Sequence, residues 1–344
     1  MGRRTLDSAH KGKKDEFYTQ YEDVEREVTY YVDFNGELFK DKVVLCPCDD
    51  GEESSFTVYF AQNFEKLGLK KLITTTYVYP PDEEEKKESN PEADRELRAK
   101  VFTLEKEDGA ERADIKNIKW KYLKGNGDFR SREMTALRDE ADFIITNPPF
   151  SLFREFIAWI MEARKKFLIL GNQNAITYKD VFPLIKDNEI WLGCRFNERV
   201  NGKNLTYRVP DYYEMNACEL FVSEKGEKFI TVPGTGWFTN IDHGKRHQPL
   251  ALMTMADNIK FSKHKEVREN GYKKYDNYDA IDIPFVDAIP SDYTGAMGVP
   301  ITFLGKYCPE QFQILKFRKG DDEKDLSVDG KCPYFRILIR KKEK

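Results

Sequence analysis

The feature that most constrains this chain is the segment 142–150, in which an apolar run leads directly into Asn147-Pro148-Pro149-Phe150. The apolar run has the length and composition of a buried strand. Adjacent prolines lack backbone N–H groups and fix φ, so the strand must end at Asn147 and the chain must leave it extended. This stiffness holds the Asn147 amide and the Pro148 carbonyl as fixed acceptors and aims the Phe150 ring into the same space. We therefore expect a site that grips an amino group on a flat ring.

Strand and helix patterns alternate over the first half of the chain. Strands are predicted at 42–48, 71–77, 100–104, 120–123 and 166–170, and helices at 21–32, 54–67, 132–141 and 151–161, with Ser54 and Ser151 as caps. This alternation predicts an α/β fold with a doubly wound, Rossmann-like sheet. Ligands of such sheets bind at the carboxyl ends of the strands, and this edge carries Asp49, Asp50 and Tyr77. The dinucleotide glycine fingerprint is missing, so we do not expect NAD or FAD.

Changes in composition suggest the domain boundaries. We expect a basic flexible arm at 1–14, a catalytic domain at 15–190 and, within it, a charged, solvated insertion loop at 80–96. From 191 to 344, prolines, glycines and aromatic residues follow one another in irregular order. This part is predicted to be a second domain that can return strands to the first sheet.

The charge balance limits how the chain can bind nucleic acid. With 56 basic and 60 acidic residues, its net charge of -4 argues against uniform electrostatic binding. The stretch 260–275 is locally basic, with six basic side chains against two acidic ones. Its cations, together with Arg246 and His247, are candidate DNA contacts: Lys260, Lys263, Lys265, Arg268, Lys273 and Lys274. The alternative is an ordinary solvated surface.

Cysteine usage and hydropathy bear on location. The six cysteines are scattered, which is typical of reduced thiols in a bacterial or phage-encoded cytoplasmic protein. Cys46 and Cys48 form the only close pair and lack a second pair at zinc spacing, so we expect no metal. No apolar run reaches the roughly 18 residues of a membrane span, and the start lacks a signal-peptide core, so we expect no membrane partner.

Two further segments have the composition of ligand contacts. Phe17-Tyr18-Thr19 precedes the first helix, where it can close over a ligand or form a hydrophobic staple. In 125–131, two glycines leave room for the backbone, Asp128 offers a carboxylate and Phe129 offers a ring face, a set that suits an amino group and a purine. A hairpin turn would explain the glycines equally well.

The motifs of the chain carry a resemblance when taken in order. They are Asp-Glu-Phe-Tyr-Thr-Gln at 15–20, Cys-Asp-Asp at 48–50, Gly-Asp-Phe-Arg-Ser at 127–131, Thr-Asn-Pro-Pro-Phe-Ser at 146–151, Gly-Val-Pro-Ile-Thr-Phe-Leu at 298–304 and Lys-Cys-Pro-Tyr-Phe-Arg-Ile-Leu-Ile at 331–339. Over nearly the whole chain this set resembles the EcoRI-type adenine-specific DNA methyltransferase family. The resemblance implies S-adenosylmethionine as cofactor, double-stranded DNA as substrate and a target-recognition domain at 191–344.

The resemblance also implies the roles of single residues. Matching cofactor-binding positions are Phe17, Tyr18, Thr19, Cys48, Asp49, Asp50, Asp128, Phe129 and Asn147. The matching catalytic positions are Asn147, Pro148, Pro149 and Phe150. The family's archetype modifies GAATTC within a restriction-modification system, so the resemblance implies a cognate endonuclease that shares the site without a stable complex. We expect a monomer.

The chemistry follows from the residues themselves. Adenine N6 is a poor nucleophile because its lone pair is delocalised into the ring. If the Asn147 oxygen and the Pro148 carbonyl accept its two hydrogens, the nitrogen becomes pyramidal and its lone pair can point at a sulfonium methyl, while Phe150 stacks on the base. The base must first leave the helix, at a cost of a few kcal/mol. Cytosine C5 methylation needs an attacking thiolate, and Cys48 lies in the first strand rather than beside the base.

Two alternatives stay open at this point. An Asn-Pro-Pro-aromatic site also suits adenine in RNA or the amide of a protein glutamine. From another class, the chain would be an inactive DNA-binding module. The intact tetrapeptide argues against such a loss of chemistry.

Overall fold

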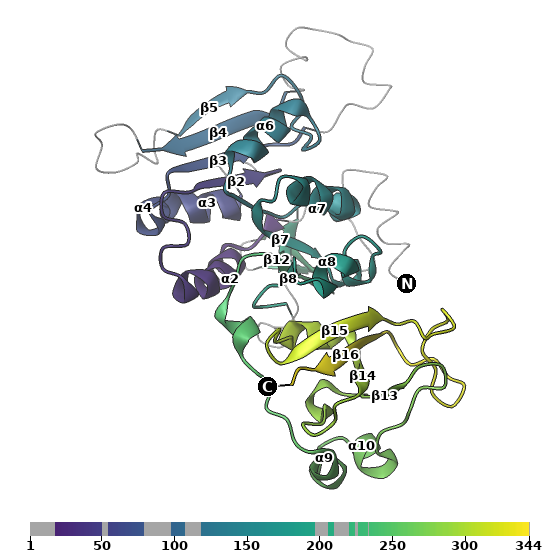
Figure 1. Ribbon diagram of the computed structural model, residues 1–344. Helices are drawn as coiled ribbons and strands as arrows, with labels where there is room; N and C mark the ends of the chain where they lie inside the picture. The colour runs from purple at the N-terminus through teal and green to yellow at the C-terminus, as the bar shows by residue number, and fades with distance from the viewer. Residues whose placement is uncertain are drawn as a thin grey trace. The chain divides into compact units, whose positions relative to one another are not determined.

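The computed structural model describes residues 18–49, 54–78, 98–106, 118–196, 206–209, 220–223, 226–232 and 234–343 (Figure 1). The predicted arm at 1–14 and the insertion at 80–96, with Phe17 and Asp50, lie outside the described residues. The chain forms two compact units. The first consists of Met1–Ala175 and Glu198–Ile241, and the second of Ile176–Asn197 and Asp242–Lys344.

One large sheet organises the first unit, with its strands in the order β5-β4-β3-β2-β6-β7-β12. These strands are β2 (Val43–Pro47), β3 (Lys71–Thr75), β4 (Lys100–Glu105), β5 (Lys119–Tyr122), β6 (Phe143–Thr146), β7 (Lys166–Asn172) and β12 (Thr235–Thr239). Strands β3, β2, β6 and β7 run parallel, whereas β4, β5 and β12 are antiparallel to their neighbours. Because β2 has β3 on one side and β6 on the other, the strand order reverses at β2, and ligands bind at such switch points.

Helices cover both faces of this sheet. They are α2 (Tyr21–Phe34), α3 (Ser55–Gln62), α4 (Phe64–Leu67), α6 (Arg132–Glu140) and α7 (Phe153–Glu162). On β12, Trp237 contacts Phe56 of α3, whereas its neighbour Phe238 contacts Phe153 of α7. Consecutive strand residues point to opposite faces, so α3 and α7 lie on opposite sides of the sheet. The mixed α/β sheet with a parallel centre confirms the predicted fold class in outline.

Several predicted element boundaries were wrong. The helix expected over 54–67 is divided at Asn63 into α3 and α4, although Ser54 does cap α3 by accepting a hydrogen bond from Phe56 N at 3.2 Å. The helix expected to begin with Ser151 as its cap begins at Phe153, after the 3-10 turn η3 (Phe150–Leu152). Pro149 imposes this delay, because its carbonyl accepts from Leu152 N and so forms a tighter turn first.

Strand β12 shows why composition alone does not give the boundaries of the two units. It lies beyond the boundary predicted at 190, yet it pairs antiparallel with β7 over Thr235–Thr239, which is the return of a strand to the first sheet that the sequence allowed. Conversely, 176–190 belong to the second unit by their contacts. The strands expected at 100–104 and 120–123 are present, but as an antiparallel pair at the edge of the sheet.

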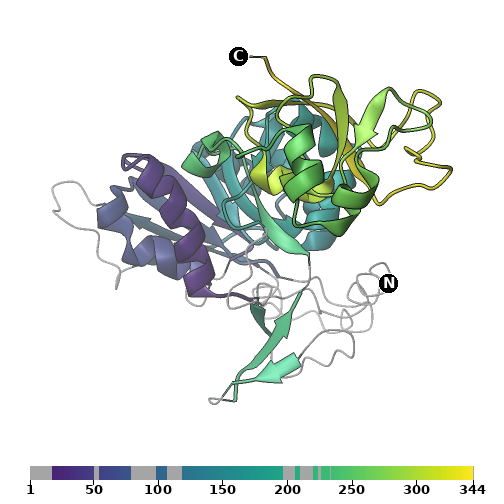
Figure 2. The same ribbon diagram turned by 90° about the horizontal axis from the view of Figure 1, so that it is seen from below.

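A second, smaller sheet belongs to the same unit. It has the order β1-β9-β11-β10, and its strands are β1 (Tyr18–Thr19), β9 (Thr206–Val209), β10 (Leu220–Val222) and β11 (Lys228–Thr231). All of its pairs are antiparallel, and Thr19 lies opposite Tyr207. In Figure 2 the later strands of this sheet are the green ribbons at the bottom of the view.

The second unit contains a four-stranded sheet in the order β13-β14-β16-β15. The elements of this unit are α8 (Phe182–Lys186), β8 (Trp191–Leu192), η5 (Gly244–His247), α9 (Met255–Phe261), α10 (Lys265–Asn270), β13 (Ala280–Asp282), η6 (Val286–Ala288), β14 (Ala296–Pro300), η7 (Ile301–Lys306), β15 (Phe312–Phe317) and β16 (Arg336–Lys341). Tyr275 lies in its core and donates a hydrogen bond to Asp282 at 2.5 Å. A Cβ at Gly298 would lie 2.0 Å from the Tyr275 hydroxyl, so this glycine of the predicted 298–304 motif is needed for packing.

Candidate active site

The ends of β2 and β6 are joined by hydrogen bonds at the switch point. The Thr146 hydroxyl lies within hydrogen-bond distance of both the Pro47 carbonyl and Asp49 Oδ2. Thr146 is fully buried and Asp49 is 7% exposed, so these bonds are shielded from water. Since Asn147 follows Thr146 directly, its position is fixed relative to β2.

Asp49 connects four elements of the first unit. Its other carboxylate oxygen accepts from the Ser54 hydroxyl at 2.6 Å, next to the amino end of α3, where a negative charge is favourable. Its backbone N donates to the Thr75 carbonyl at the end of β3, at 2.8 Å. The carboxylate therefore has a structural role, and no local pattern in the sequence indicates its bond to Thr146.

Cys48 occupies the turn between β2 and Asp49. Its φ of 65° lies in the left-handed region, where a residue other than glycine is strained. Burial raises the pKa of the Cys48 thiol, and the carboxylates of Asp49 and Asp128 raise it further. The thiol therefore stays protonated at neutral pH, which disfavours a role as a nucleophile.

The loop 125–128 brings Asp128 to the same edge of the sheet. It is fastened to the segment after β3, because Val78 N donates to the Asn126 carbonyl at 2.9 Å and Asn126 Nδ2 donates back to the Val78 carbonyl at 3.1 Å. Gly127 has φ 83°, and a Cβ there would lie 2.2 Å from the Thr76 carbonyl oxygen. Gly127 thus serves a close approach of two backbones rather than a hairpin turn between strands.

Tyr77 and Arg130 complete the surroundings of Asp128. Burial raises the pKa of Tyr77, and the Asp128 carboxylate raises it further, which places the two groups in one electrostatic environment. Arg130 donates to Asp128 from Nε at 2.9 Å and from Nη2 at 2.6 Å, and this pair lowers the pKa of Asp128. Arg130 also reaches Glu155 of α7 at 3.0 Å. The ion pair between Arg130 and Asp128 could have been predicted from the sequence, because the two residues lie only two positions apart.

Phe129 differs from the expectation that its ring faces a purine. The side chain is 2% exposed, and its ring contacts those of Phe156 and Trp159 at centroid distances of 5.0 and 5.6 Å. The Phe129 side chain points inward and packs beside α7, whereas the side chain of the preceding Asp128 points outward. The chain then turns into α6. Only the backbone of Phe129 is left to face a ligand.

The Asn-Pro-Pro-Phe segment is partly accessible. Pro148 is buried, whereas Asn147, Pro149 and Phe150 are half-buried. The turn that follows uses the carbonyl of Pro149, which accepts from Leu152 N at 3.0 Å, rather than the carbonyl of Pro148. The Pro148 carbonyl, which is the predicted acceptor for an amino group, therefore takes no part in this turn.

Phe153 anchors the chain just after this segment. Its ring lies against Phe238 at a centroid distance of 5.0 Å, and a Cβ on Gly171 of β7 would lie 2.3 Å from it. Because Phe153 is fixed between β7 and β12, the start of α7 holds the preceding tetrapeptide in place.

The motif ahead of the first helix is described only in part. Thr19 is 6% exposed and belongs to β1, which contacts α3. Of Tyr18 the structure describes the backbone in β1, and Phe17 and Asp50 lie outside the described residues. The structure thus places Cys48, Asp49, Asp128 and Asn147 at ends or loops of one sheet edge, and it leaves the enclosure by 17–19 as a prediction.

The residues expected to contact DNA occupy different environments in the second unit. Arg246 is 8% exposed, lies 3.6 Å over the Trp191 ring and donates to Asn188 at 2.5 Å. Burial lowers its pKa. His247 is held between Asp242 at 2.8 Å and Glu310 at 2.9 Å. Arg246 is thus an interior residue, which its sequence surroundings do not reveal.

The lysines of 260–275 remain on the surface. Lys260, Lys265, Lys273 and Lys274 are exposed. Ion pairs join Lys263 to Asp287 at 2.6 Å, Lys265 to Glu269 at 3.5 Å and Lys273 to Asp329 at 2.7 Å, and Arg268 donates to the Ser262 carbonyl. Exposed pairs of this kind contribute about 0–1 kcal/mol, so a phosphate can replace the carboxylate.

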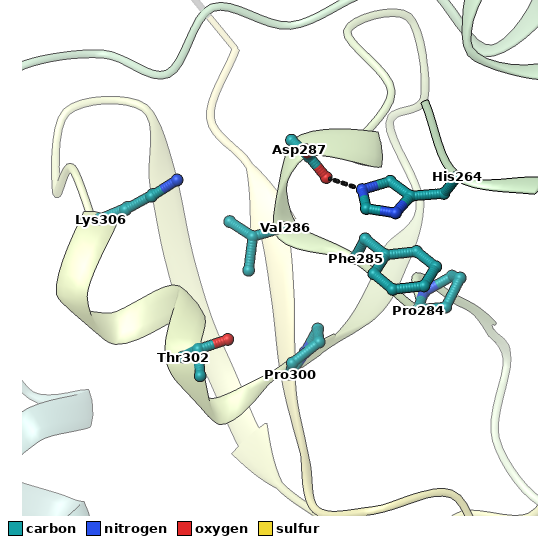
Figure 3. Close-up of a pocket in the computed structure, with 8 residues that line it drawn as sticks. All are labelled: His264, Pro284, Phe285, Val286, Asp287, Pro300, Thr302 and Lys306. Carbon is teal, nitrogen blue, oxygen red and sulfur yellow. Dashed lines mark hydrogen bonds and ion pairs between the residues drawn. The ribbon is translucent and has the colours of Figure 1, made fainter. Parts of the chain in front are cut away.

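A cavity of about 460 Å³ lies beside this basic stretch (Figure 3). His264 stacks on Phe285 at a ring distance of 3.7 Å and bonds to Asp287 at 2.7 Å. Thr302 and Lys306 line the other side in the figure. No sequence pattern indicates this cavity, because its walls come from segments distant in the chain.

A parallel-centred α/β sheet with Asn-Pro-Pro-Phe at the end of the strand next to its switch point defines the class of methyltransferases that act on amino groups. The model of the family "Adenine-specific methyltransferase EcoRI" matches residues 5–342, and the chain belongs to this family. It is therefore an adenine-specific DNA methyltransferase of the type II modification class, which sets aside the RNA, glutamine and inactive alternatives.

Curated relatives are similar over almost their full length. The chain is 46% identical to the Type II methyltransferase M.EcoRI of Escherichia coli, covering 98% of this chain and 97% of the relative. It is 36% identical to the Type II methyltransferase M.MpnI of Mycoplasma pneumoniae, covering 97% of each, and 33% identical to the Type II methyltransferase M.MgeORF184P of Mycoplasma genitalium, covering 97% and 98%. No solved structure matches the chain significantly. Among the described residues, no helix has the length and apolarity needed to cross a membrane.

Proposed function

We propose that this enzyme transfers a methyl group from S-adenosylmethionine to N6 of an adenine flipped out of duplex DNA. The observation that carries the proposal is the placement of Asn147 at the end of β6, fixed to β2 through the bond between Thr146 and Asp49. A fixed acceptor is needed because catalysis here consists of positioning and charge stabilisation.

The residues at the sheet edge suit the cofactor in charge and shape. S-adenosylmethionine supplies an electrophilic methyl group on a cationic sulfonium. The carboxylate of Asp49 favours a cationic ligand. The half-buried Tyr77 offers an aromatic ring beside Asp128, whose carboxylate is paired with Arg130 and remains a proposed hydrogen-bond acceptor for the cofactor. The other proposed contacts are Cys48, the backbone of Phe129, and Phe17, Tyr18, Thr19 and Asp50.

The proposed chemistry of the tetrapeptide uses three groups. Asn147 Oδ1 and the Pro148 carbonyl accept the two N6 hydrogens, which directs the nitrogen lone pair toward the methyl group. Phe150, half-buried at the start of η3, stacks on the adenine ring. Pro149 keeps the turn rigid through its bond to Leu152.

The second unit is proposed to recognise the target. Its exposed cations Lys260, Lys263, Lys265, Arg268, Lys273 and Lys274 would contact phosphates, and His247 would join them. Arg246 instead supports the unit from within, because its guanidinium is already engaged by Trp191 and Asn188. The proposed target is a GAATTC-like site, modified by a monomer in the bacterial cytoplasm, with a cognate endonuclease outside any stable complex.

Single-molecule sequencing of DNA from cells that express the protein tests this function, because it reports the modified base and its sequence context together. The expected result is N6-methyladenine in one short sequence. Cells expressing the Asn147→Ala variant provide the control and should show none. Methylated cytosine, or no modified base in DNA, would contradict the proposal.

A further inference from the structure

The edge strand β5 carries exposed aromatic and basic side chains outside the site described above. Trp120 is 51% exposed and Tyr122 is 42% exposed, and their rings meet edge to face at 5.3 Å. Lys100 Nζ of β4 lies 5.0 Å from the Trp120 ring. Large exposed aromatics beside cations are typical of surfaces that bind nucleic acid. We call the set Lys100, Trp120, Tyr122 and Lys124 the β5 strip.

The lysines of the β5 strip are available to an anionic partner. Lys124 is exposed and Lys100 is half-buried. Within the part of the chain that the structure describes, no carboxylate lies within ion-pair distance of their ammonium groups. The nearby Glu133 instead accepts hydrogen bonds from the backbone N–H of Lys124 and of Gly125. The charge of the strip is therefore complementary to phosphates.

The β5 strip faces the same edge of the sheet as the active site. Strand β4 is antiparallel to β3 and β5 is antiparallel to β4, so β5 runs in the direction of β3. Strands β2 and β6 are parallel to β3, so β5 ends at the edge where they end. Figure 1 shows β5, β4, β3 and β2 side by side in this order. Neighbouring strands are about 4.8 Å apart, which puts β5 about 14 Å from β2 and about 19 Å from β6. At about 3.4 Å per base pair, this span corresponds to about four to six base pairs of duplex.

We infer that the β5 strip binds the sugar-phosphate backbone of duplex DNA about four to six base pairs from the target adenine. This rests on the proposed function, since the DNA must pass along the carboxyl edge of the sheet. The lysines contact phosphates, and the faces of Trp120 and Tyr122 pack against the sugars. Such contacts read no bases. They raise the affinity for DNA with long flanks and leave the sequence preference unchanged.

The test compares two double variants in DNA binding. In Lys100→Gln/Lys124→Gln the strip loses two cations. In Lys66→Gln/Lys70→Gln two exposed cations are lost near the opposite edge, since Lys70 directly precedes β3. Both are titrated with a short GAATTC duplex that has no flanking base pairs and is closed at each end by an uncharged polyether linker, and with a long GAATTC duplex that has flanks of roughly 15 base pairs. Binding is followed by fluorescence anisotropy over a series of salt concentrations. Thermal melting confirms that both variants are folded.

On the long duplex, the strip variant is expected to bind roughly tenfold more weakly at low salt, and the slope of log K against log salt is expected to fall by about 2. On the short duplex it should match the wild type, and the control variant should match it on both. Equal slopes for strip variant and wild type on the long duplex overturn the inference. An equal loss on both lengths also overturns it, because the contacts would then lie within the recognition sequence.

The same samples separate this inference from the proposed function. If the wild type methylates neither duplex, the proposed target is contradicted, and the salt slopes still report on the strip. If the wild type methylates the long duplex while the slopes of all variants agree, only the strip is contradicted. Trp120→Ala adds a variant without a charge change, which should weaken binding to the long duplex while its salt slope stays the same.

Discussion

The hydroxyl of Thr146 is hydrogen bonded to the carboxylate of Asp49, which ties the end of β6 to the end of β2 one residue before Asn147. Ser54 holds the other oxygen of the same carboxylate. The position of the proposed catalytic amide therefore depends on buried polar groups that do not touch the substrate.

Thr146→Val tests this support, because it keeps the shape of the side chain and removes the hydroxyl. The free energy of unfolding is expected to fall by about 1–3 kcal/mol, since a buried carboxylate loses a hydrogen bond. The turnover number should fall as well, because Asn147 is released from its position. Thr146→Ser, which keeps the hydroxyl, should retain most of the activity. Urea unfolding and methyl-transfer assays measure both effects, and a fully active, fully stable Thr146→Val enzyme would contradict the role.

Gly127→Ala is expected to disturb the loop that carries Asp128. The new Cβ would lie 2.2 Å from the Thr76 carbonyl oxygen, at a φ of 83° that is strained for alanine. The stability should fall by about 2 kcal/mol or more, and cofactor binding should weaken. Gly125→Ala is the matched control, because the nearest atom to its Cβ lies 3.7 Å away. Calorimetric titration with S-adenosylmethionine distinguishes the two, and equal behaviour would show that Gly127 is dispensable.

Arg246→Gln is expected to act on stability rather than on DNA contacts. The variant loses the stacking on Trp191 and part of the bond to Asn188, so its melting temperature should fall. The slope of log K against log salt for DNA binding should remain that of the wild type. Lys260→Gln, at an exposed position, should lower the slope by about 0.9 and leave the melting temperature unchanged. A lower slope for Arg246→Gln would contradict this expectation and show that Arg246 contacts a phosphate.

His243 predicts a pH dependence of the stability of the second unit. Burial lowers its pKa from 6.5 to about 4, and the ring is held by the Leu192 carbonyl at 3.2 Å. Between these values the unfolded chain binds a proton that the folded chain does not, so stability is lost as the pH falls from 6.5 toward 4. The loss amounts to at most about 3 kcal/mol. His243→Gln should remove this part of the pH dependence in urea unfolding, and an unchanged pH profile would contradict it.

The sequence predicts the parallel centre of the sheet because its strands are local, apolar and separated by capped helices. Ser54 and the stop at Asn147 are of this kind, since each acts on its immediate neighbours. The antiparallel return of Thr235–Thr239 to β7 is not local, because more than sixty residues separate the two strands, and pairing over such a distance leaves no pattern in either.

The same distinction between local and long-range contacts explains which features of the site can be predicted from the sequence. Asn147 and Asp49 can be predicted because both end apolar runs, whereas the bond between Thr146 and Asp49 joins residues 97 positions apart. Phe129 and Arg246 were expected to face ligands because their residue types suit those ligands. Their burial depends on Trp159 and Trp191, which contact them only in the folded chain. Residue type thus indicates what a side chain can bind, and packing decides whether it is accessible.

Methyl transfer by the Asn147→Ala variant tests the central claim most directly. The measurement is incorporation of labelled methyl groups from S-adenosylmethionine into duplex DNA, with cofactor binding followed on the same sample. The variant is expected to bind the cofactor nearly as the wild type does and to transfer no detectable methyl group, because N6 then lacks the side-chain acceptor. An Asn147→Ala enzyme that methylates adenine at a rate near that of the wild type would contradict the mechanism.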